Sequence, residues 1–455
     1  MAVVDEVVTL TVLPQPPTVR RVTIPDFLNL WKSKYADWDL PDINITHLVT
    51  KFVGKLDLAA WNRSIDLLLQ KHPILNARVE VHGEVAEFVL ESGQPREPLA
   101  LVDPPASSGK DPRLALQELA AALVWRPFDR RGGRLFRAFM IKVSDGECVL
   151  GIVVHHAIAD GWSMGVIGRE LLVGYAAVIT GRPITLPGAE IQYPDYIEWM
   201  RDWLESAEGR RQKEYWANQM ANTQSMRLPT QSNIDFDAKA DWAKESFPID
   251  PQLVGSLCKR ASQTRATPFL FALTAKIAAL ASVTGSCDVV VTIVVEQRGQ
   301  SKLRNTIGIL VNYLPIRVSV NWNDSFDQLA AQVRSTYFEA CANQMYPFAL
   351  INPREDAFPF LRFRRIIGDN EAAANSDRGF QFFELPPPPP TRTTAEGVGH
   401  ELFILQTANS MSVRIRYLPT LHKKETVTTF AEVFCRALAL GAYGSMSPLS
   451  LLRES

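Results

Sequence analysis

Two adjacent histidines, His155 and His156, are followed closely by a carboxylate at Asp160 and a glycine at Gly161. An imidazole can take a proton from an amine or a hydroxyl at neutral pH, which makes histidine the commonest general base. We predict that His156 is this base and that His155 supports it. A lone histidine more often packs in a core, but the combination of four residues favours chemistry.

Asp160 lies four residues after His156, and two roles are open to it. Its carboxylate could hold the imidazole, or it could pair with an arginine and fix the loop. Gly161 has no side chain, so a substrate can pass close to the backbone there.

The elements around these residues are predicted from periodicity. Residues 149–154 form a short, almost wholly apolar run, which is typical of a strand buried on both faces. Apolar residues then recur at helical spacing from Met164 to Val178, and Gly181 ends the pattern. The segment 155–161 is therefore predicted to be a loop between a buried strand and a helix.

Other parts of the chain show the same elements. An amphipathic helix is predicted to follow Asp57, and a strand over 75–81 is predicted to form a hairpin with 85–90. In the second half, Thr267 and Pro268 open a helix that Gly285 closes, and a valine-rich strand follows. Strands over 401–406 and 412–417 precede a final helix. The pattern favours a duplicated α/β fold.

Composition excludes several classes of function. The 48 Lys and Arg nearly balance the 49 Asp and Glu, so no global basic field exists to hold nucleic acid or a membrane surface. The five cysteines form no CxxC pair, which disfavours a disulfide framework and a structural zinc site. Lys276 interrupts the longest apolar stretch, and no basic signal-peptide start is present. We expect a cytoplasmic monomer without a metal.

The segment HHAIADGWS at 155–163 resembles the HHxxxDGxS signature of the condensation domains of nonribosomal peptide synthetases, which belong with chloramphenicol acetyltransferase-like acyltransferases. Four further segments are similar to elements of that family in the same order, and the resemblance covers about residues 25–440. They are KHPIL at 71–75, YPDYIEW at 193–199, IGILVNYLPIR at 307–317 and NQMYPF at 343–348.

The chain departs from the family pattern at three positions within or directly after these segments. Pro73 and Asn76 replace a glutamate and an arginine, and Asn343 replaces a histidine. These departures suggest a stand-alone or unusual member of the family.

The resemblance implies an α/β fold in which two chloramphenicol acetyltransferase-like subdomains form a V around a central tunnel. We place the N-terminal subdomain, with the HHxxxDG loop, at residues 1–180. The C-terminal subdomain, with the crossing segments, then occupies residues 181–455. A donor and an acceptor would enter from opposite sides and meet at His156.

The resemblance also assigns further residues. Asp160 would be structural support, paired with Arg298, and Asn312 would lie near the tunnel as a substrate-binding residue. Ser163 and Trp199 are two more candidates for substrate contact. The alternatives are a solvated loop charge for Arg298, backbone support for Asn312 and packing for Trp199.

The implied reaction joins a carrier-protein-bound acyl or aminoacyl thioester to an amine or alcohol, giving an amide or an ester. No cofactor is bound, because phosphopantetheine on an acyl or peptidyl carrier protein delivers the donor. The acceptor is a small molecule or is also carrier-bound. Two alternatives stay open: a CoA-dependent acyltransferase of the BAHD or polyketide-associated type, and an inactive module that docks carriers.

The distribution of basic residues separates the first two of these functions. CoA carries phosphates that need a basic site, yet no Lys or Arg follows Gly161 and Trp162 until Arg169. This favours delivery by a carrier, although distant residues such as Arg20, Arg21 and Lys302 could converge on the site.

Overall fold

The computed structural model describes residues 19–25, 45–82, 85–91, 96–104, 111–129, 132–183, 191–224, 226–231, 242–351, 358–365, 379–386, 400–407, 410–444 and 447–453. These residues form two compact units. Unit 1 takes the described residues of Met1–Glu205, Gln297–Val311 and Asn370–Pro389, and unit 2 takes those of Ser206–Glu296, Asn312–Asp369 and Pro390–Ser455.

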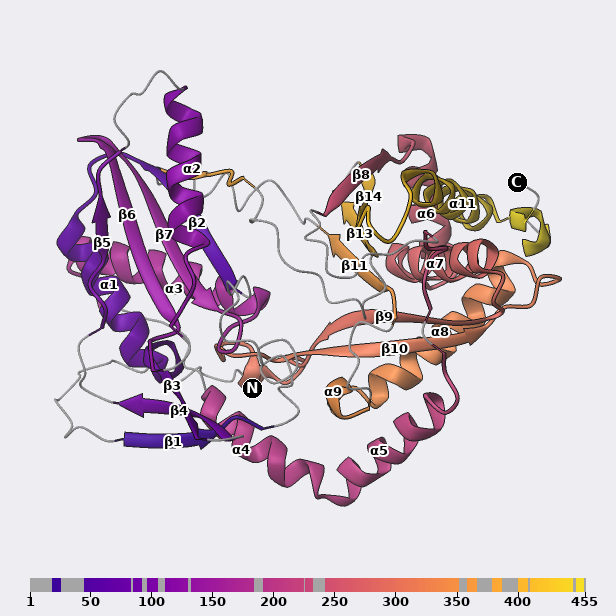
Figure 1. The fold of residues 1–455 in the computed structure, drawn as a ribbon, viewed down its shortest axis with the longest axis horizontal. Helices are drawn as coiled ribbons and strands as arrows, with labels where there is room; N and C mark the ends of the chain where they lie inside the picture. The colour runs from indigo at the N-terminus through magenta and orange to yellow at the C-terminus, as the bar shows by residue number, and fades with distance from the viewer. Residues whose placement is uncertain are drawn as a thin grey trace, which may run out of the picture. The chain divides into compact units, whose positions relative to one another are not determined.

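Unit 1 contains eight named strands and four named α-helices among its described residues. Figure 1 labels α1 to α4 and β1 to β7. The strands are β1 (Val19–Thr23), β2 (Ile45–Val53), β3 (Arg78–His82), β4 (Val85–Glu91), β5 (Ala100–Val102), β6 (Phe136–Ser144), β7 (Glu147–His155) and β12 (Phe380–Phe382). The helices are α1 (Leu58–Lys71), α2 (Pro112–Val124), α3 (Gly161–Thr180) and α4 (Tyr193–Leu204), with short 3-10 helices η2 (Pro73–Asn76) and η3 (Ser301–Leu303).

The main sheet of unit 1 has the strand order β12-β2-β7-β6-β5, and β1, β4 and β3 form a separate small sheet. Neighbouring residues on a strand point to opposite faces. On β2, Leu48 meets α3 at Gly168, whereas the His47 ring meets Trp125 at the C-terminal end of α2. The two helices therefore cover opposite faces of the sheet.

Strand β7 lies in the middle of this sheet, between β2 and β6. Eight of its nine residues are buried, which explains why its sequence is an apolar run instead of an alternation. Gly151 allows a close approach, since a Cβ there would lie 2.1 Å from the Phe139 ring. The strand ends at His155, so the HHxxxDG loop starts at the end of a central, rigid strand.

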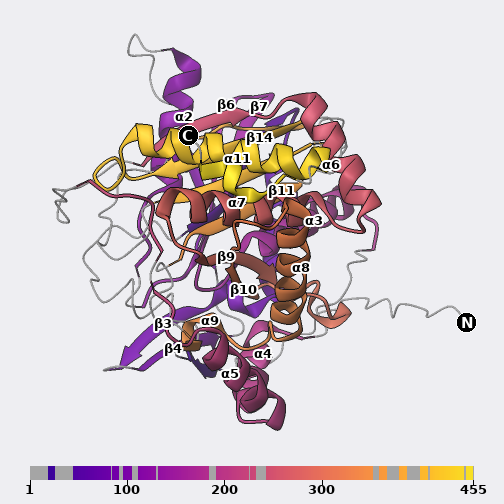
Figure 2. The same ribbon diagram turned by 90° about the vertical axis from the view of Figure 1, so that its right-hand side faces the viewer.

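Unit 2 is built on a six-stranded mixed sheet in the order β10-β9-β11-β13-β14-β8. Its strands are β8 (Ala243–Pro248), β9 (Asp288–Glu296), β10 (Val311–Ser319), β11 (Phe360–Arg365), β13 (His400–Gln406) and β14 (Met411–Tyr417). Its helices are α5 (Ala207–Gln219), α6 (Pro251–Gln263), α7 (Pro268–Thr284), α8 (Phe326–Ala342), α9 (Phe348–Ile351) and α11 (Lys424–Tyr443), and η4 (Leu449–Arg453) follows. Figure 2 shows α6, α7 and α11 together in front of the sheet.

Most of the predicted elements are present. Asp57 caps α1 by accepting a hydrogen bond from the Ala60 N–H, and Gly181 ends α3 with φ of 62°. The helix closed by Gly285, the valine-rich strand β9 and the strands β13 and β14 are confirmed as well.

One predicted strand differs from the observed fold, and several observed strands, β12 among them, were not predicted. The strand predicted over 75–81 begins only at Arg78, because Pro73 starts a 3-10 turn that contains Leu75. Strand β12 joins the edge of the unit 1 sheet by pairing with β2, and Phe380 packs against Phe52 with ring centroids 4.9 Å apart.

The predicted domain boundary at residue 180 coincides with the end of α3 and stays a prediction. The compact units are not continuous in sequence, because α4 and the segments Gln297–Val311 and Asn370–Pro389 group with unit 1. Each unit is therefore assembled from several stretches of the chain.

Among the described helices, α3 is long and apolar enough to cross a membrane. Helices α6 and α7 pass the same test only if they are counted as one span, and they are bent by 108° relative to each other. The tested α3 segment is 50% buried inside the structure. Such burial is typical of a core helix.

Helix α3 is tied to the end of α1 by a buried charge cluster. The Glu170 carboxylate lies 2.6 Å from Lys71 Nζ and 2.9 Å from His72 Nε2, and its side chain has no exposed area. Burial alone would raise the pKa of Glu170, but the hydrogen bonds and charges of His72 and Lys71 hold it below its usual value. The cluster therefore stabilises the fold at neutral pH.

We expect Glu170→Gln to lower the free energy of unfolding at pH 7 by about 3 kcal/mol, because the Lys71 charge loses its buried partner. A carboxyl whose pKa is depressed on folding stabilises above its unfolded pKa and loses that effect as the pH falls. Urea unfolding from pH 8 to pH 4 measures the difference in free energy of unfolding between wild type and Glu170→Gln. This difference should stay constant down to about pH 5 and become smaller below it. Glu147→Gln, which breaks the part-exposed pair with Lys51, should cost less than about 1 kcal/mol. A deficit that grows as the pH falls would contradict this role for Glu170.

Candidate active site

His155 is fully buried at the end of β7. Its Nδ1 accepts a hydrogen bond from the Ala157 N–H at 3.0 Å, so in the neutral ring the proton is on Nε2. Its ring packs edge-on against Phe128, and the Arg137 guanidinium lies 4.2 Å from the Phe128 centroid. Burial lowers the pKa of Arg137 to about 10. His155 thus holds the loop backbone at the Ala157 N–H, and its support of catalysis stays a prediction.

His156 has the opposite tautomer. Its Nδ1 lies 3.0 Å from the Ala159 carbonyl oxygen, which can only accept a hydrogen bond. Nδ1 therefore carries the proton, and Nε2 of the neutral ring has the lone pair. His156 is also only half-buried, unlike His155. The loop thus presents one imidazole with a basic nitrogen set by the backbone.

Asp160 is 2% exposed, and its carboxylate accepts five hydrogen bonds. Two come from the Ser163 N–H and hydroxyl, at 2.9 and 2.8 Å, and cap the N-terminus of α3. Two come from Arg298, at 2.7 and 3.0 Å, and one comes from the Leu310 N–H at 3.0 Å. Of the two roles open to Asp160, these contacts support fixing the loop.

Arg298 is 4% exposed, so the alternative of a solvated loop charge is wrong. It also donates to the carbonyls of Thr306 and Gly308, both at 3.3 Å. The pair therefore connects the start of α3 to the segment Gln297–Val311. Side chains 138 positions apart are held in one desolvated network.

Ser163 lies inside this network and has no exposed area. Its hydroxyl lies 2.8 Å from Asp160 Oδ1 and 3.0 Å from the Gly308 carbonyl, and it accepts from the Gly308 N–H at 3.1 Å. These contacts occupy the hydroxyl in support of the backbone. Substrate contact by Ser163 stays a prediction.

Two tyrosines of α4 close the network on another side. The Tyr196 hydroxyl donates to Gln297 Oε1 at 2.6 Å, and burial raises the pKa of both Tyr193 and Tyr196. Both hydroxyls thus stay protonated beside the ion pair. Gly308 is required here, because a Cβ would lie 2.1 Å from the Tyr193 ring.

Gly161 and Trp162 form the exposed start of α3. A Cβ at Gly161 would meet nothing within 4 Å, so packing within this chain does not demand glycine there. Trp162 is 42% exposed, and its Nε1 donates to the Arg304 carbonyl at 2.8 Å. The open space is consistent with the approach of a substrate predicted at Gly161.

Trp199 lies on α4 and is 42% exposed. Its ring contacts Tyr196 at 5.9 Å and Trp203 at 6.5 Å between centroids. These contacts account for the packing role, and no described contact connects Trp199 to the HHxxxDG loop.

Asn312 lies in unit 2 and is 6% exposed. Its amide nitrogen donates to the carbonyls of Gln344 and Tyr346, and its Oδ1 accepts from the N–H groups of Tyr313 and Phe348. All four hydrogen-bonding positions of the amide are therefore used by backbone. This geometry supports the alternative of backbone support over substrate binding.

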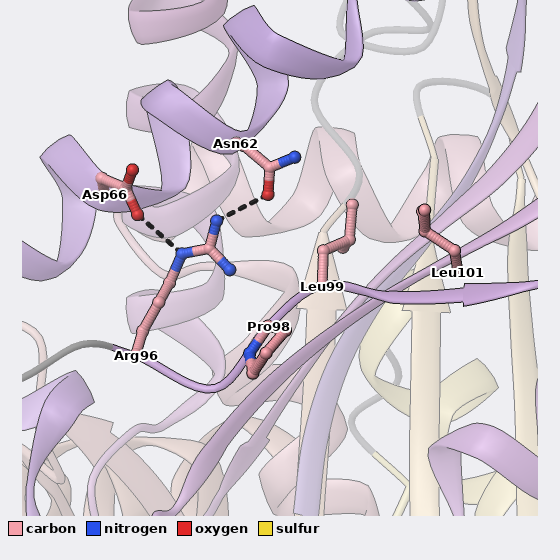
Figure 3. Close-up of a pocket in the computed structure, with 6 residues that line it drawn as sticks. All are labelled: Asn62, Asp66, Arg96, Pro98, Leu99 and Leu101. Atoms are coloured by element: carbon pink, nitrogen blue, oxygen red, sulfur yellow. Dashed lines mark hydrogen bonds and ion pairs between the residues drawn. The ribbon is translucent and has the colours of Figure 1, made fainter.

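A surface hollow of about 530 Å³ lies elsewhere in unit 1, between α1 and β5 (Figure 3). Arg96 crosses it, with Nε 2.6 Å from Asp66 and a second nitrogen 2.5 Å from Asn62. It contains none of the predicted site residues. In the described part of the chain, no group of three or more His, Cys, Asp or Glu is placed to hold a metal ion.

Two groups essential to the loop were not predicted, namely the Ala159 carbonyl and the Leu310 N–H. Both belong to the backbone, so no residue type marks them in the sequence.

A family model described as "Condensation domain" matches residues 41–450. The chain belongs to the condensation-domain family. Malpibaldin synthetase from Mortierella alpina is 31% identical over 340 residues, which are 72% of this chain and 6% of that protein. A beauvericin nonribosomal cyclodepsipeptide synthetase from Gibberella fujikuroi is 28% identical over 410 residues, or 88% of this chain and 13% of that protein. The chain thus spans a small part of either relative.

Solved structures of the family share the fold. The X-domain complexed with OxyB from teicoplanin biosynthesis has a TM-score of 0.78 at 19% identity, covering 97% of each chain. The first condensation domain of the calcium-dependent antibiotic synthetase has a TM-score of 0.69 at 18% identity, covering 95% of this chain and 99% of that one. The predicted α/β fold with two chloramphenicol acetyltransferase-like subdomains is confirmed. The V-shaped arrangement around a tunnel stays a prediction.

We expect Asp160→Ala and Arg298→Ala each to lower the free energy of unfolding by about 3–5 kcal/mol, since either leaves an uncompensated buried group. The double variant should lose clearly less than the sum of the two. Urea unfolding of all three condensation-domain variants measures the coupling. The same cycle on the exposed pair Asp288 and Arg317 should give a coupling below about 1 kcal/mol. Additive losses at Asp160 and Arg298 would contradict a strong interaction.

Proposed function

We propose that this condensation domain joins a carrier-bound acyl or aminoacyl thioester to an amine or an alcohol. The family supports the formation of amide or ester bonds. The observation that carries the proposal is the His156 ring, whose Nδ1 is held by the Ala159 carbonyl so that Nε2 can accept a proton. The thioester is the activated group, so neither a nucleotide nor an acyl-enzyme is needed.

Nε2 of His156 takes a proton as the acceptor nitrogen or oxygen attacks the thioester carbonyl. The tetrahedral intermediate then breaks its C–S bond, and the thiolate recovers the proton as a free thiol. Base catalysis of this kind accelerates a reaction by about 10²- to 10⁴-fold. The positioning of both substrates supplies the rest of the rate acceleration.

The other loop residues position this imidazole. Asp160 and Arg298 fix the end of the loop, and His155 fixes its start through the Ala157 N–H. Between these two anchors lie only His156 to Ala159. We therefore assign Asp160, His155 and Arg298 as positioning residues and His156 alone as the catalytic residue.

The donor is proposed to arrive on the phosphopantetheine arm of an acyl or peptidyl carrier protein, with no cofactor bound to the enzyme. The acceptor is a small molecule or is itself carrier-bound. The proposal includes a monomer in the cytoplasm that binds neither nucleic acid nor membrane. A CoA thioester would replace the carrier thioester in the first alternative.

A binding function is the second alternative, and one observation favours it. The structure of an X-domain in complex with OxyB shows a protein of this fold bound to a partner. On this alternative the chain would bind carriers without turnover. The His156 tautomer favours catalysis instead, because a docking surface does not require a basic nitrogen.

We expect His156→Ala to lower kcat by about 10²- to 10⁴-fold with an unchanged circular dichroism spectrum, because a half-buried loop imidazole contributes little to packing. Product formation under steady state measures the effect. The matched control is His82→Ala, which removes an imidazole that is 66% exposed and should keep full activity. Activity of His156→Ala within about threefold of wild type would contradict the assignment of His156 as the catalytic base.

The donor is tested by presenting one acyl group as a carrier thioester, a CoA thioester and a pantetheine thioester with the same acceptor. We expect the carrier thioester to give the highest kcat/KM, because docking of the carrier adds binding energy to that of the arm. Equal or faster use of the CoA thioester would favour the CoA-dependent alternative. Tight carrier binding without any product would favour the binding module.

A further inference from the structure

Helix α3 exposes a stripe of residues immediately after the HHxxxDG loop. Gly161, Trp162, Gly165 and Arg169 are all exposed, and their spacing places them on one side of the helix. A Cβ at Gly161 or Gly165 would meet nothing within 4 Å. The helix therefore offers open space between the indole and the guanidinium, which lie about 10 Å apart along its axis.

The segment Ser301–Asn305 lies along this stripe. The Arg304 carbonyl accepts from Trp162 Nε1 at 2.8 Å, and one residue later Asn305 Oδ1 accepts from Arg169 at 2.8 Å. Trp162 and Arg169 thus hold two consecutive residues of the segment. The side chains of Lys302 and Arg304 are exposed and start from this same short stretch.

Three positively charged residues lie on or next to this contact, namely Arg169 on the helix and Lys302 and Arg304 on the segment that it touches. Arg169 contacts the neutral Asn305 side chain, and no acidic group of the described residues pairs with Arg169, Lys302 or Arg304. Nearby carboxylates are used elsewhere, since Asp160 pairs with Arg298 and Glu170 pairs with Lys71. The local field is therefore positive although the net charge of the whole chain is −1.

We propose that Arg169, Lys302 and Arg304 form a phosphate-binding site for the phosphopantetheine arm of the donor or acceptor. This phosphate site rests on the proposed function, because that function supplies a phosphorylated arm. Guanidinium groups bind phosphate oxygens through charge-assisted hydrogen bonds, and lysine adds a point charge.

The phosphate site also revises an expectation from the sequence. The absence of basic residues between Gly161 and Arg169 argued against a CoA phosphate site near the loop, and Lys302 was one of the distant residues that could converge on it. The fold brings Lys302 and Arg304 to Trp162 from 140 and more positions away. One phosphate is common to a carrier arm and to CoA, so the site alone does not require the nucleotide.

Isothermal titration calorimetry of the full chain with pantetheine, 4′-phosphopantetheine and coenzyme A tests the site without turnover. We expect 4′-phosphopantetheine to bind at least about tenfold more tightly than pantetheine at low salt, and coenzyme A to bind no more tightly than 4′-phosphopantetheine. The preference for the phosphate should shrink as salt is raised, because exposed charges are screened.

Three single variants, Arg169→Gln, Lys302→Gln and Arg304→Gln, should each weaken 4′-phosphopantetheine binding about threefold, and the triple variant should abolish the preference. Binding of pantetheine should not change. The matched control is Lys55→Gln, which removes an exposed charge just past the end of β2 opposite the HHxxxDG loop. Lys302 makes no described side-chain contact, so its variant stays informative if the triple variant does not fold.

The phosphate site is overturned if wild type shows no preference for 4′-phosphopantetheine, or if the preference survives in the folded triple variant. Coenzyme A could instead bind more than tenfold more tightly than 4′-phosphopantetheine and lose this gain in the triple variant. That result would assign the three basic residues to the nucleotide of coenzyme A and would overturn their assignment to the phosphopantetheine arm. The proposed function fails separately. A preference for the phosphate without any product formation supports the phosphate site and rejects the proposed reaction. Product formation without that preference supports the proposed reaction and rejects the phosphate site.

Discussion

The buried ion pair between Asp160 and Arg298 is the constraint on which the site depends. A carboxylate that is 2% exposed is costly unless its charge is compensated, and here five donors compensate it. Those donors come from the first turn of α3 and from the segment Gln297–Val311, so a rearrangement of either one would break hydrogen bonds with the other. The loop that carries His156 connects the central strand β7 to this ion pair. Its geometry follows from electrostatics at one end and strand pairing at the other.

The two adjacent histidines divide their tasks through backbone contacts of opposite kind. One Nδ1 faces an N–H and the other faces a carbonyl, so the neutral rings carry their protons on different nitrogens. Direct pairing with the carboxylate is not needed to set the His156 tautomer. The buried charge provides rigidity, while a neutral carbonyl orients the base. This separation keeps a strong charge network close to the loop without using it as the proton relay.

The sequence predicted the elements well where periodicity and end signals agreed, as for α1, α3 and α7. The predicted start of β3 was wrong, because Pro73 starts a 3-10 turn inside an alternating pattern. Strand β12 was missed, because its three residues lie far along the chain from β2, the strand with which they pair at the sheet edge. Substrate contact by Ser163 and Asn312 stays a prediction, but the contacts of both side chains with specific backbone groups could not be predicted. Residue type shows that a side chain can form hydrogen bonds, but only the fold shows that backbone groups already occupy them.

Strand β12 and the segment Gln297–Val311 belong to unit 1, but in the sequence they follow the first residues of unit 2. Consequently, neither unit is the product of one continuous stretch of gene. A chimaera made from two relatives with one crossover between residues 205 and 297 would inherit Asp160 from one parent and its arginine, the Leu310 backbone and the edge strand from the other. Exchange between family members is therefore limited less by the chemistry of the histidine loop than by where its supporting partners are encoded.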